Sequence, residues 1–190
     1  MVTWQEGANS FIDALADKSS VPGGGSAAAF SAAMGAALLM MSVGVTIKRK
    51  ATPQADKNFL TPYLDALEQY KQDFKKLTEE DAAAYLEVIK IKKQPASAEQ
   101  EIALAKAQIK AAEIPALTAQ KIQDLLKIIA EIENKIATII VSDLLCARVL
   151  LFAGLKCCAE NIKTNLPYVA DEKFKNKLQA ELEKINLCQQ

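Results

Sequence analysis

Residues 23–47 read GGGSAAAFSAAMGAALLMMSVGVTI, and this stretch decides the fold. From Ala27 to Ile47 it runs for 21 residues without a charged side chain and consists mostly of Ala, Gly, Ser and Met. Alanine and methionine favour the helix, and small side chains allow neighbouring helices to approach closely. Such a segment is typical of a helix that is buried at the centre of a bundle.

A membrane-spanning helix is the alternative interpretation, because 21 apolar residues are long enough to cross a bilayer. The hydrophobicity of this run is modest, however. The second long apolar stretch, Ile136–Leu155, carries Asp143 and Arg148, whose charges are costly in lipid. We therefore favour a helix buried in protein and expect no association with membranes.

The rest of the chain is also rich in helix formers. Alanine supplies 32 of the 190 residues, and aromatic residues make up 6%. Capping residues and prolines divide the chain into six expected helices, at about Thr3–Ala16, Ser26–Ile47, Thr61–Lys92, Ser97–Glu133, Ile136–Asn165 and Asp171–Leu187. Pro115 is expected to kink the fourth. We predict an all-α fold, an up-and-down bundle of about six helices in one domain covering residues 1–190, with the small-residue apolar helix at its centre.

Composition excludes several classes of function. The chain has no histidine, so triads that contain His and sites in which His binds zinc or haem are excluded. The 23 basic and 23 acidic residues leave no net charge, which argues against a nucleic-acid binder. The N-terminus has no secretory signal pattern, and the four cysteines lack the CxxC spacing of a metal or redox site. We expect a cytoplasmic protein with reduced thiols and no metal.

Three consecutive glycines precede the small-residue helix, in the segment Pro22–Ser26. Glycine can adopt positive φ, and the free N–H groups at a helix N-terminus attract anions or carbonyl oxygens. The alternative is a sharp turn with Ser26 as the helix N-cap. Because the chain has only seven glycines, we favour a binding function for Gly23, Gly24, Gly25 and Ser26.

Two carboxylates and a basic cluster are the other candidates for chemistry. Asp143 lies in an apolar helix, where burial would raise its pKa and suit it to acid–base catalysis; a structural carboxylate is an equally good interpretation. Asp81 and Tyr85 are one helical turn apart, but this spacing alone favours an ordinary charged surface. The cluster Lys48-Arg49-Lys50 ends the small-residue helix, where cations are stabilised by the helix dipole.

The segment Pro22–Ala29, opening a small-residue helix, resembles the cyclodeaminase/cyclohydrolase family of folate enzymes. Further segments agree in the same order along nearly the whole chain: Thr46–Lys50, Glu80–Tyr85, Ala112–Pro115, Ser142-Asp143, Gly154, Asn161 and Asn165-Leu166. One dipeptide departs from the pattern. The family usually has Gly-Asn six to seven residues before the Asp, where this chain has Ile136-Ala137.

The resemblance implies an enzyme of one-carbon tetrahydrofolates, either a methenyltetrahydrofolate cyclohydrolase or a formiminotetrahydrofolate cyclodeaminase, with no cofactor beyond the folate substrate. Because carboxylates stabilise cations and relay protons, our hypothesis gives Asp143 the cation-stabilising or general-base role in this reaction, with Asp81 as the alternative. The glycine loop, Ser26, Asn161 and Asn165 would bind the substrate, and Lys48, Arg49 and Lys50 its glutamate tail. The competing hypothesis is a non-catalytic bundle that binds a folate-like ligand or a protein partner, which the loss of Gly-Asn favours.

The spacing of these residues raises a geometric problem. Asp143 and Asn161 are 18 residues apart, which on a straight helix places them about 27 Å apart. One small reaction centre cannot contact both. Either one of the polar sets is structural, or a subunit interface brings opposite ends of two bundles together. We favour the interface and therefore predict a homodimer, as the family resemblance also implies.

Overall fold

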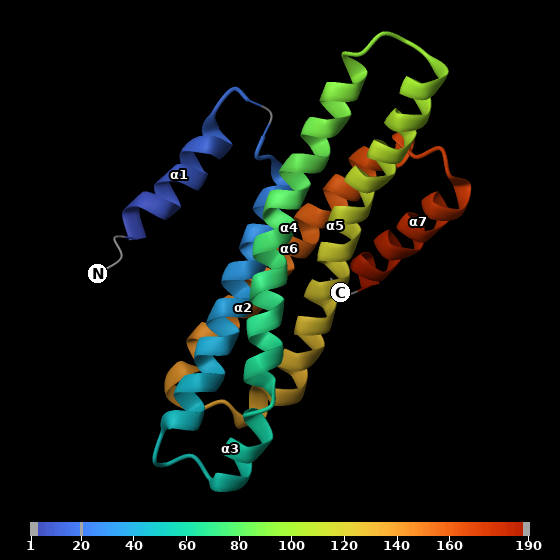
Figure 1. Ribbon diagram of the computed structural model, residues 1–190. Coiled ribbons are helices and arrows are strands. Elements are labelled where there is room, and N and C mark those ends of the chain that lie inside the picture. The colour runs from blue at the N-terminus through green and yellow to red at the C-terminus, as the bar shows by residue number, and fades with distance from the viewer. Residues whose placement is uncertain (1–3, 20, 188–190) are drawn as a thin grey trace.

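The computed structural model describes residues 4–19 and 21–187. Within these ranges it contains no strand, and its α-helices are α1 (Trp4–Ala16), α2 (Gly24–Lys48), α3 (Gln54–Leu60), α4 (Tyr63–Lys92), α5 (Ala98–Ile132), α6 (Val141–Asn165) and α7 (Glu172–Leu187). Helices α2, α4, α5 and α6 form an elongated bundle in which successive helices run in opposite directions (Figure 1). The predicted all-α class is confirmed, and the short α3 adds a seventh helix that we did not expect.

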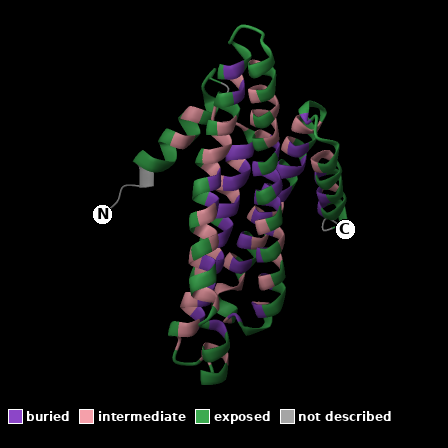
Figure 2. Ribbon diagram, turned by 45° about the vertical axis from the view of Figure 1, so that its right-hand side comes forward, coloured by how far each residue is buried: buried purple, intermediate pink, exposed green. Residues whose placement is uncertain are grey.

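Small residues allow α2 and α6 to pack closely. A Cβ atom added at Gly35 would lie 2.9 Å from the Leu151 side chain, and one added at Gly154 would lie 3.0 Å from the backbone oxygen of Ala28. α2 packs mainly against α4 and α6. Its inward face is buried, as Figure 2 shows for the bundle as a whole. The chain therefore uses its glycines and alanines where these two helices touch.

By length and composition alone, α2 and the segment Thr138–Tyr168 are apolar enough to cross a membrane. In the fold, 44% of the most apolar 18 residues of α2 and 28% of those of Thr138–Tyr168 are buried inside the protein. Each segment therefore packs one face into the core and leaves apolar side chains on its outer face. The expected central helix is thus present, but it is not enclosed on all sides.

Helix boundaries mostly follow the capping signals. The Ser97 hydroxyl accepts a hydrogen bond from the Gln100 backbone N–H at 3.1 Å, so α5 begins where the capping box predicts. The expected start of the next helix at Ile136 is wrong, because 3₁₀ turns at Glu133–Lys135 and Thr138–Ile140 precede α6. Ile136 is extended, and its buried side chain continues the apolar run without helical geometry.

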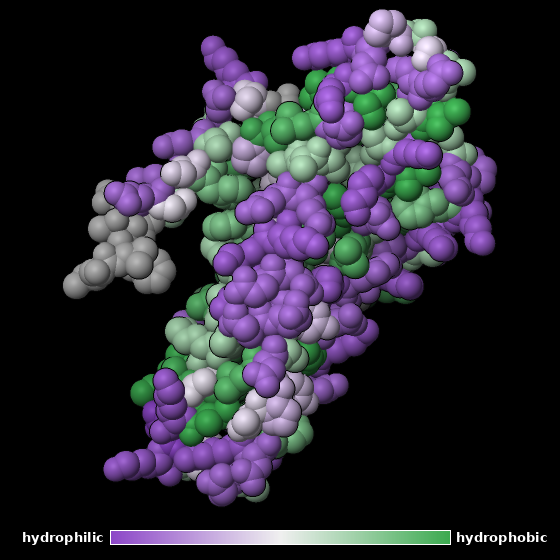
Figure 3. All heavy atoms as spheres, in the orientation of Figure 1, coloured by the Kyte–Doolittle hydropathy of each residue, from purple (hydrophilic) through white to green (hydrophobic). Residues whose placement is uncertain are grey.

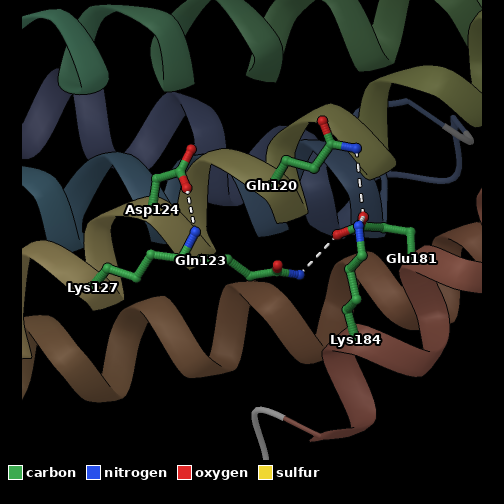
Figure 4. Close-up of polar contacts among 6 residues, drawn as sticks. All are labelled: Gln120, Gln123, Asp124, Lys127, Glu181 and Lys184. Carbon is green, nitrogen blue, oxygen red and sulfur yellow. Dashed lines mark hydrogen bonds and ion pairs between the residues drawn. The ribbon is translucent and has the colours of Figure 1, made fainter.

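Helices α1 and α7 lie outside the bundle. α1 projects from it in Figure 1, and its Phe11 ring stacks on Phe30 with centroids 4.4 Å apart. Thr3, where we expected α1 to start, lies outside the described residues. α7 packs on α5 and α6. Its buried Glu181 accepts hydrogen bonds from Gln123 at 2.7 Å and Gln120 at 3.5 Å (Figure 4), which fixes α7 against the bundle.

Candidate functional site

A pocket of about 170 Å³ opens where the first turn of α2, the middle of α4 and the last turns of α6 meet. These three helices, α2, α4 and α6, come from distant parts of the sequence. Its lining residues include Gly23, Gly24, Gly25, Asp81, Tyr85, Ala111, Asn161, Thr164 and Asn165. The structure therefore brings the predicted glycine loop, Asp81 and both predicted asparagines into one site.

Asp81 is the acidic residue of this pocket. Its Oδ2 atom accepts a hydrogen bond from the hydroxyl of Ser26 at 2.9 Å, and the Ser26 side chain is fully buried. Burial raises the pKa of Asp81 above its ordinary value, although hydrogen bonds from the Ser26 hydroxyl and backbone oppose the shift. A carboxyl group in this environment is suited to accept and return a proton.

The three glycines provide space and do not supply positive φ. No described glycine has a positive φ, so our expectation of that conformation is wrong. α2 already begins at Gly24, with Gly23 as its N-cap. A Cβ atom added at Gly25 would lie 2.1 Å from Oδ1 of Asp81, and one at Gly24 would lie 3.3 Å from the Asn161 amide nitrogen. The polar side chains of α4 and α6 thus approach the backbone of α2 directly.

Ser26 is not the N-cap of α2, which was the alternative interpretation of the glycine segment. Gly23 holds that position, and no side chain caps the helix. Ser26 lies within the first turn of α2, and its hydroxyl donates to Asp81, whereas an N-cap hydroxyl would accept from a backbone N–H of the helix. The residue therefore connects the glycine loop to the carboxylate.

Asn165 is held in place by the proline in α5. In a helix the N–H of residue i bonds to the carbonyl of residue i−4, so Pro115, which has no N–H, leaves the Ala111 carbonyl without its helical partner. The Asn165 amide nitrogen donates to this oxygen at 3.2 Å. α5 continues through Pro115 as one helix. Proline and asparagine thus join the end of α6 to the middle of α5 beside the pocket.

Asn161, unlike Asn165, makes its hydrogen bond within its own helix, α6. Its amide nitrogen donates to the Cys157 carbonyl at 2.8 Å. Sequence reasoning missed two neighbours, Thr164 and Cys158. Thr164 lines the pocket, and Cys158 is buried near Asp81, where burial, Cys157 and Asp81 together raise the pKa of its thiol. Cys158 precedes Asn161 by three residues and Thr164 follows it by three, and this helical spacing is the signal that could have found them.

The other predicted residues lie at the opposite end of the bundle. Asp143 is in the first turn of α6 and is only partly buried, so the expected burial in a helix interior is wrong. The Ser142 hydroxyl lies 3.5 Å from its Oδ2 atom. Lys48 ends α2, which separates it from Gly24 by about 36 Å of helix axis. Arg49 and Lys50 follow Lys48, so one copy of the chain does not bring these residues to the pocket.

The model of the formiminotransferase-cyclodeaminase family matches residues 7–184. The chain belongs to this family. Within the cyclodeaminase family, it is similar to the methenyltetrahydrofolate cyclohydrolase of Methylorubrum extorquens. The two are 30% identical over 181 residues, which cover 91% of this chain and 85% of that protein. The resemblance inferred from the glycine motif is therefore confirmed.

Two further family members give the same result. The formimidoyltransferase-cyclodeaminase of Gallus gallus is 29% identical over 173 residues, and this chain spans only 31% of its length. A crystal structure of formiminotetrahydrofolate cyclodeaminase from Thermotoga maritima matches with a TM-score of 0.84 at 26% identity. The match covers 94% of this chain and 87% of that one, so the two share the fold over nearly their full length.

The pocket offers one carboxylate, amide groups and exposed backbone. Among residues 4–19 and 21–187, no group of three or more His, Cys, Asp and Glu side chains is placed to hold a metal ion. A positive charge that forms or binds at the pocket would be stabilised by Asp81. Amide side chains beside it can donate to and accept from a polar heterocycle.

Proposed function

We propose that this chain is a methenyltetrahydrofolate cyclohydrolase, which adds water to the 5,10-methenyl bridge to give 10-formyltetrahydrofolate. The observation that carries the proposal is Asp81, a partly buried carboxylate with a raised pKa at a glycine-lined pocket. Family membership and the similarity to a cyclohydrolase over 85% of that protein support it.

The chemistry needs one group that stabilises a cation and moves a proton. The methenyl bridge carries a delocalised positive charge, which the Asp81 carboxylate attracts. Water attacks the bridge carbon and forms a C–O bond while Asp81 accepts the water proton. Asp81 then returns the proton to N5 as the bond between N5 and the carbon breaks. The remaining hydroxyl proton leaves to solvent as the formyl carbonyl forms, so the reaction releases one proton in total.

We assign the catalytic role to Asp81 in preference to Asp143. Asp81 shares its pocket with the glycine loop, Asn161 and Asn165, whereas Asp143 lies at the far end of α6. The two asparagines and the backbone of the loop are suited to hydrogen-bond the pterin. The departure Ile136-Ala137 also lies at the far end, because the Ala137 N–H donates to Thr46 at 3.0 Å.

A direct test follows the absorbance of 5,10-methenyltetrahydrofolate with and without protein. We expect the wild type to accelerate the decay of the methenyltetrahydrofolate absorbance. Asp81→Asn should lower the rate of this decay by at least 100-fold, and Asp143→Asn should retain turnover. Tight binding without turnover would instead support the non-catalytic binder. A rate unchanged by Asp81→Asn would refute the assignment.

Formiminotetrahydrofolate cyclodeaminase is the second candidate, because the Thermotoga maritima cyclodeaminase shares the fold with a TM-score of 0.84. This reaction closes the formimino group to the methenyl bridge and releases ammonia. It passes through a similar tetrahedral carbon, so the same carboxylate would serve it. Ammonia release from formiminotetrahydrofolate separates the two activities.

We further propose that the chain forms a homodimer through the outer face of α2 and α6. Its exposed side chains include Met34, Met41, Leu145 and Val149, of which Val149 is 66% exposed. Hydrophobic side chains are visible over α2 and α6 at the left edge of the lower half in Figure 3, whereas hydrophilic ones cover much of α4. A two-fold axis across this face would place opposite ends of the two bundles side by side.

Val149→Glu tests the dimer, because it places a charge at the middle of the proposed interface. We expect the molar mass from light scattering to change from that of two chains to that of one. Turnover by the resulting monomer shows whether the second copy contributes to the site. A wild-type protein that is monomeric at micromolar concentration would overturn the proposal.

A further inference from the structure

A second chamber of about 200 Å³ adjoins the Asp81 pocket on the side toward the C-terminal end of α4. The two chambers share lining residues, among them Tyr85 and Asn165, so they form the two halves of one cleft between α4, α5 and α6. The second chamber adds Lys92, Gln108 and Tyr168. Nothing in the chemistry assigned to Asp81 uses these three side chains.

The cleft has opposite charges at its two ends. Asp81 is the one carboxylate among the residues that line the first chamber, and Lys92 is the one cation among those that line the second. The Lys92 ammonium lies 5.2 Å from the centre of the Tyr168 ring, and it makes no ion pair within residues 4–19 and 21–187. Its charge is therefore available to an anionic ligand group, and the aromatic ring holds it over the chamber.

Resting on the proposed function, we propose that the second chamber binds the carboxylate end of the folate substrate and that Lys92 is its counter-charge. Asp81 and Lys92 are 11 residues apart on α4, about 16 Å along the helix axis. The substrate has the same polarity as the cleft. An aromatic ring and an amide separate its cationic bridge from its glutamate carboxylates, a distance on the order of 10 Å. The length of the Lys92 side chain makes up the difference between this distance and the distance of about 16 Å along α4.

Tyr85 and Gln108 suit the part of the substrate between its two charged ends. Tyr85 lines both chambers and is 43% exposed, so its ring is accessible to the aminobenzoyl ring. Gln108, on α5, brings an amide to the wall of the second chamber, where it can bond the benzoyl amide or a carboxylate.

This assignment replaces the one that we made from the sequence. Lys48, Arg49 and Lys50 line neither chamber, and about 36 Å of α2 separates Lys48 from the glycine loop. A glutamate tail that starts at the Asp81 pocket does not span that distance within one copy of the chain. Lys92 lies in the adjoining chamber.

The test compares ligands that differ only in the glutamate. Isothermal titration measures the affinity of the protein, residues 1–190, for p-aminobenzoyl-glutamate and for p-aminobenzamide. Turnover is measured with methenyltetrahydrofolate and with the primary amide of methenyltetrahydropteroate, which keeps the benzoyl amide and lacks the glutamate and its carboxylates. The variants are Lys92→Glu, the matched control Lys93→Glu, which reverses the neighbouring charge outside both chambers, and the triple reversal of Lys48, Arg49 and Lys50 to Glu.

We expect Lys92→Glu to weaken binding of p-aminobenzoyl-glutamate and raise the KM for methenyltetrahydrofolate, each by about tenfold, with kcat little changed. For the ligands without glutamate the change should be less than about twofold. Added salt should weaken binding of the glutamate ligand to wild type and not to Lys92→Glu. Lys93→Glu and the triple variant should behave as wild type.

Equal losses with and without the glutamate, or a tenfold loss in the triple variant in place of Lys92→Glu, would overturn the proposal. A wild type that binds the two fragments equally would overturn it as well. Failure of the proposed function has a different signature, because a protein without turnover would still report in the titration whether Lys92 discriminates between the fragments.

Discussion

Gly25→Ala tests whether the closeness of Asp81 to the α2 backbone is what makes the site. The new Cβ atom would lie 2.1 Å from Oδ1 and 2.6 Å from Cγ of Asp81, far inside van der Waals contact. The carboxylate must move away, and its 2.9 Å hydrogen bond from Ser26 is lost with it. A hydrogen bond to a charged group contributes about 1.5–3 kcal/mol, which corresponds to a loss of about 10- to 150-fold in rate if the bond also positions Asp81 for catalysis.

Gly44→Ala is the matched control on the same helix. A Cβ atom at Gly44 would meet nothing within 4 Å, and the position lies in the interior of α2. Replacing a helical glycine with alanine there should raise the free energy of unfolding by up to about 1 kcal/mol and leave the rate unchanged. The assay is the decay of methenyltetrahydrofolate absorbance, with thermal unfolding of each variant alongside. A Gly25→Ala protein with wild-type turnover and stability would refute the steric reasoning.

Four more measurements test the contacts described above. Burial raises the pKa of Asp81 in the folded state, so the folded protein keeps the Asp81 proton at a pH where the unfolded chain has lost it. The stability of the wild type should therefore fall relative to that of Asp81→Asn as the pH rises above 3.8, the ordinary pKa of the group. Chemical unfolding of both proteins at pH 3 and pH 7 measures this difference. Turnover should need the ionised form of Asp81. The acid limb of the pH–rate profile should therefore lie above pH 3.8, and variants distant from the pocket should not shift it. Asn165→Ala should destabilise by about 1–3 kcal/mol in wild type and by less in a Pro115→Ala background, which restores an N–H; equal costs in a double-mutant cycle would contradict the bond exchange. Glu181→Ala should cost about 1–3 kcal/mol because two glutamine amides lose their acceptor, whereas the exposed Glu183→Ala should stay within about 0.5 kcal/mol in the same denaturant titration.

The main helices could be predicted because their boundaries are local. Ser97 and its capping box act within one turn, and the apolar run of α2 is a property of consecutive residues. The 3₁₀ turns before α6 could not be found in this way. Residues 136–141 are apolar almost throughout, and such a run is equally compatible with helix and with the extended conformation that Ile136 adopts.

The site was harder to predict because it depends on contacts between distant segments. The sequence indicated Gly23–Ser26 and the two asparagines, but it ranked Asp143 above Asp81. Asp81 lies in a charged run, and its hydrogen-bond partner Ser26 is 55 residues earlier in the chain. Asp143 lies in an apolar run, yet its place in the first turn of α6 leaves it partly exposed. Hydropathy along the chain therefore gave the wrong environment for both carboxylates.

Helix α1 has a consequence for the cooperativity of the protein. An isolated helix of 13 residues is marginally stable in water. The Phe11 ring of α1 stacks on Phe30 of the bundle, while its Ile12 is 60% exposed. Its amide protons should exchange with solvent through local fraying, at rates independent of global unfolding, while those of α2 exchange only when the bundle opens. Protection of the α1 amides would therefore report directly on anything that covers this helix.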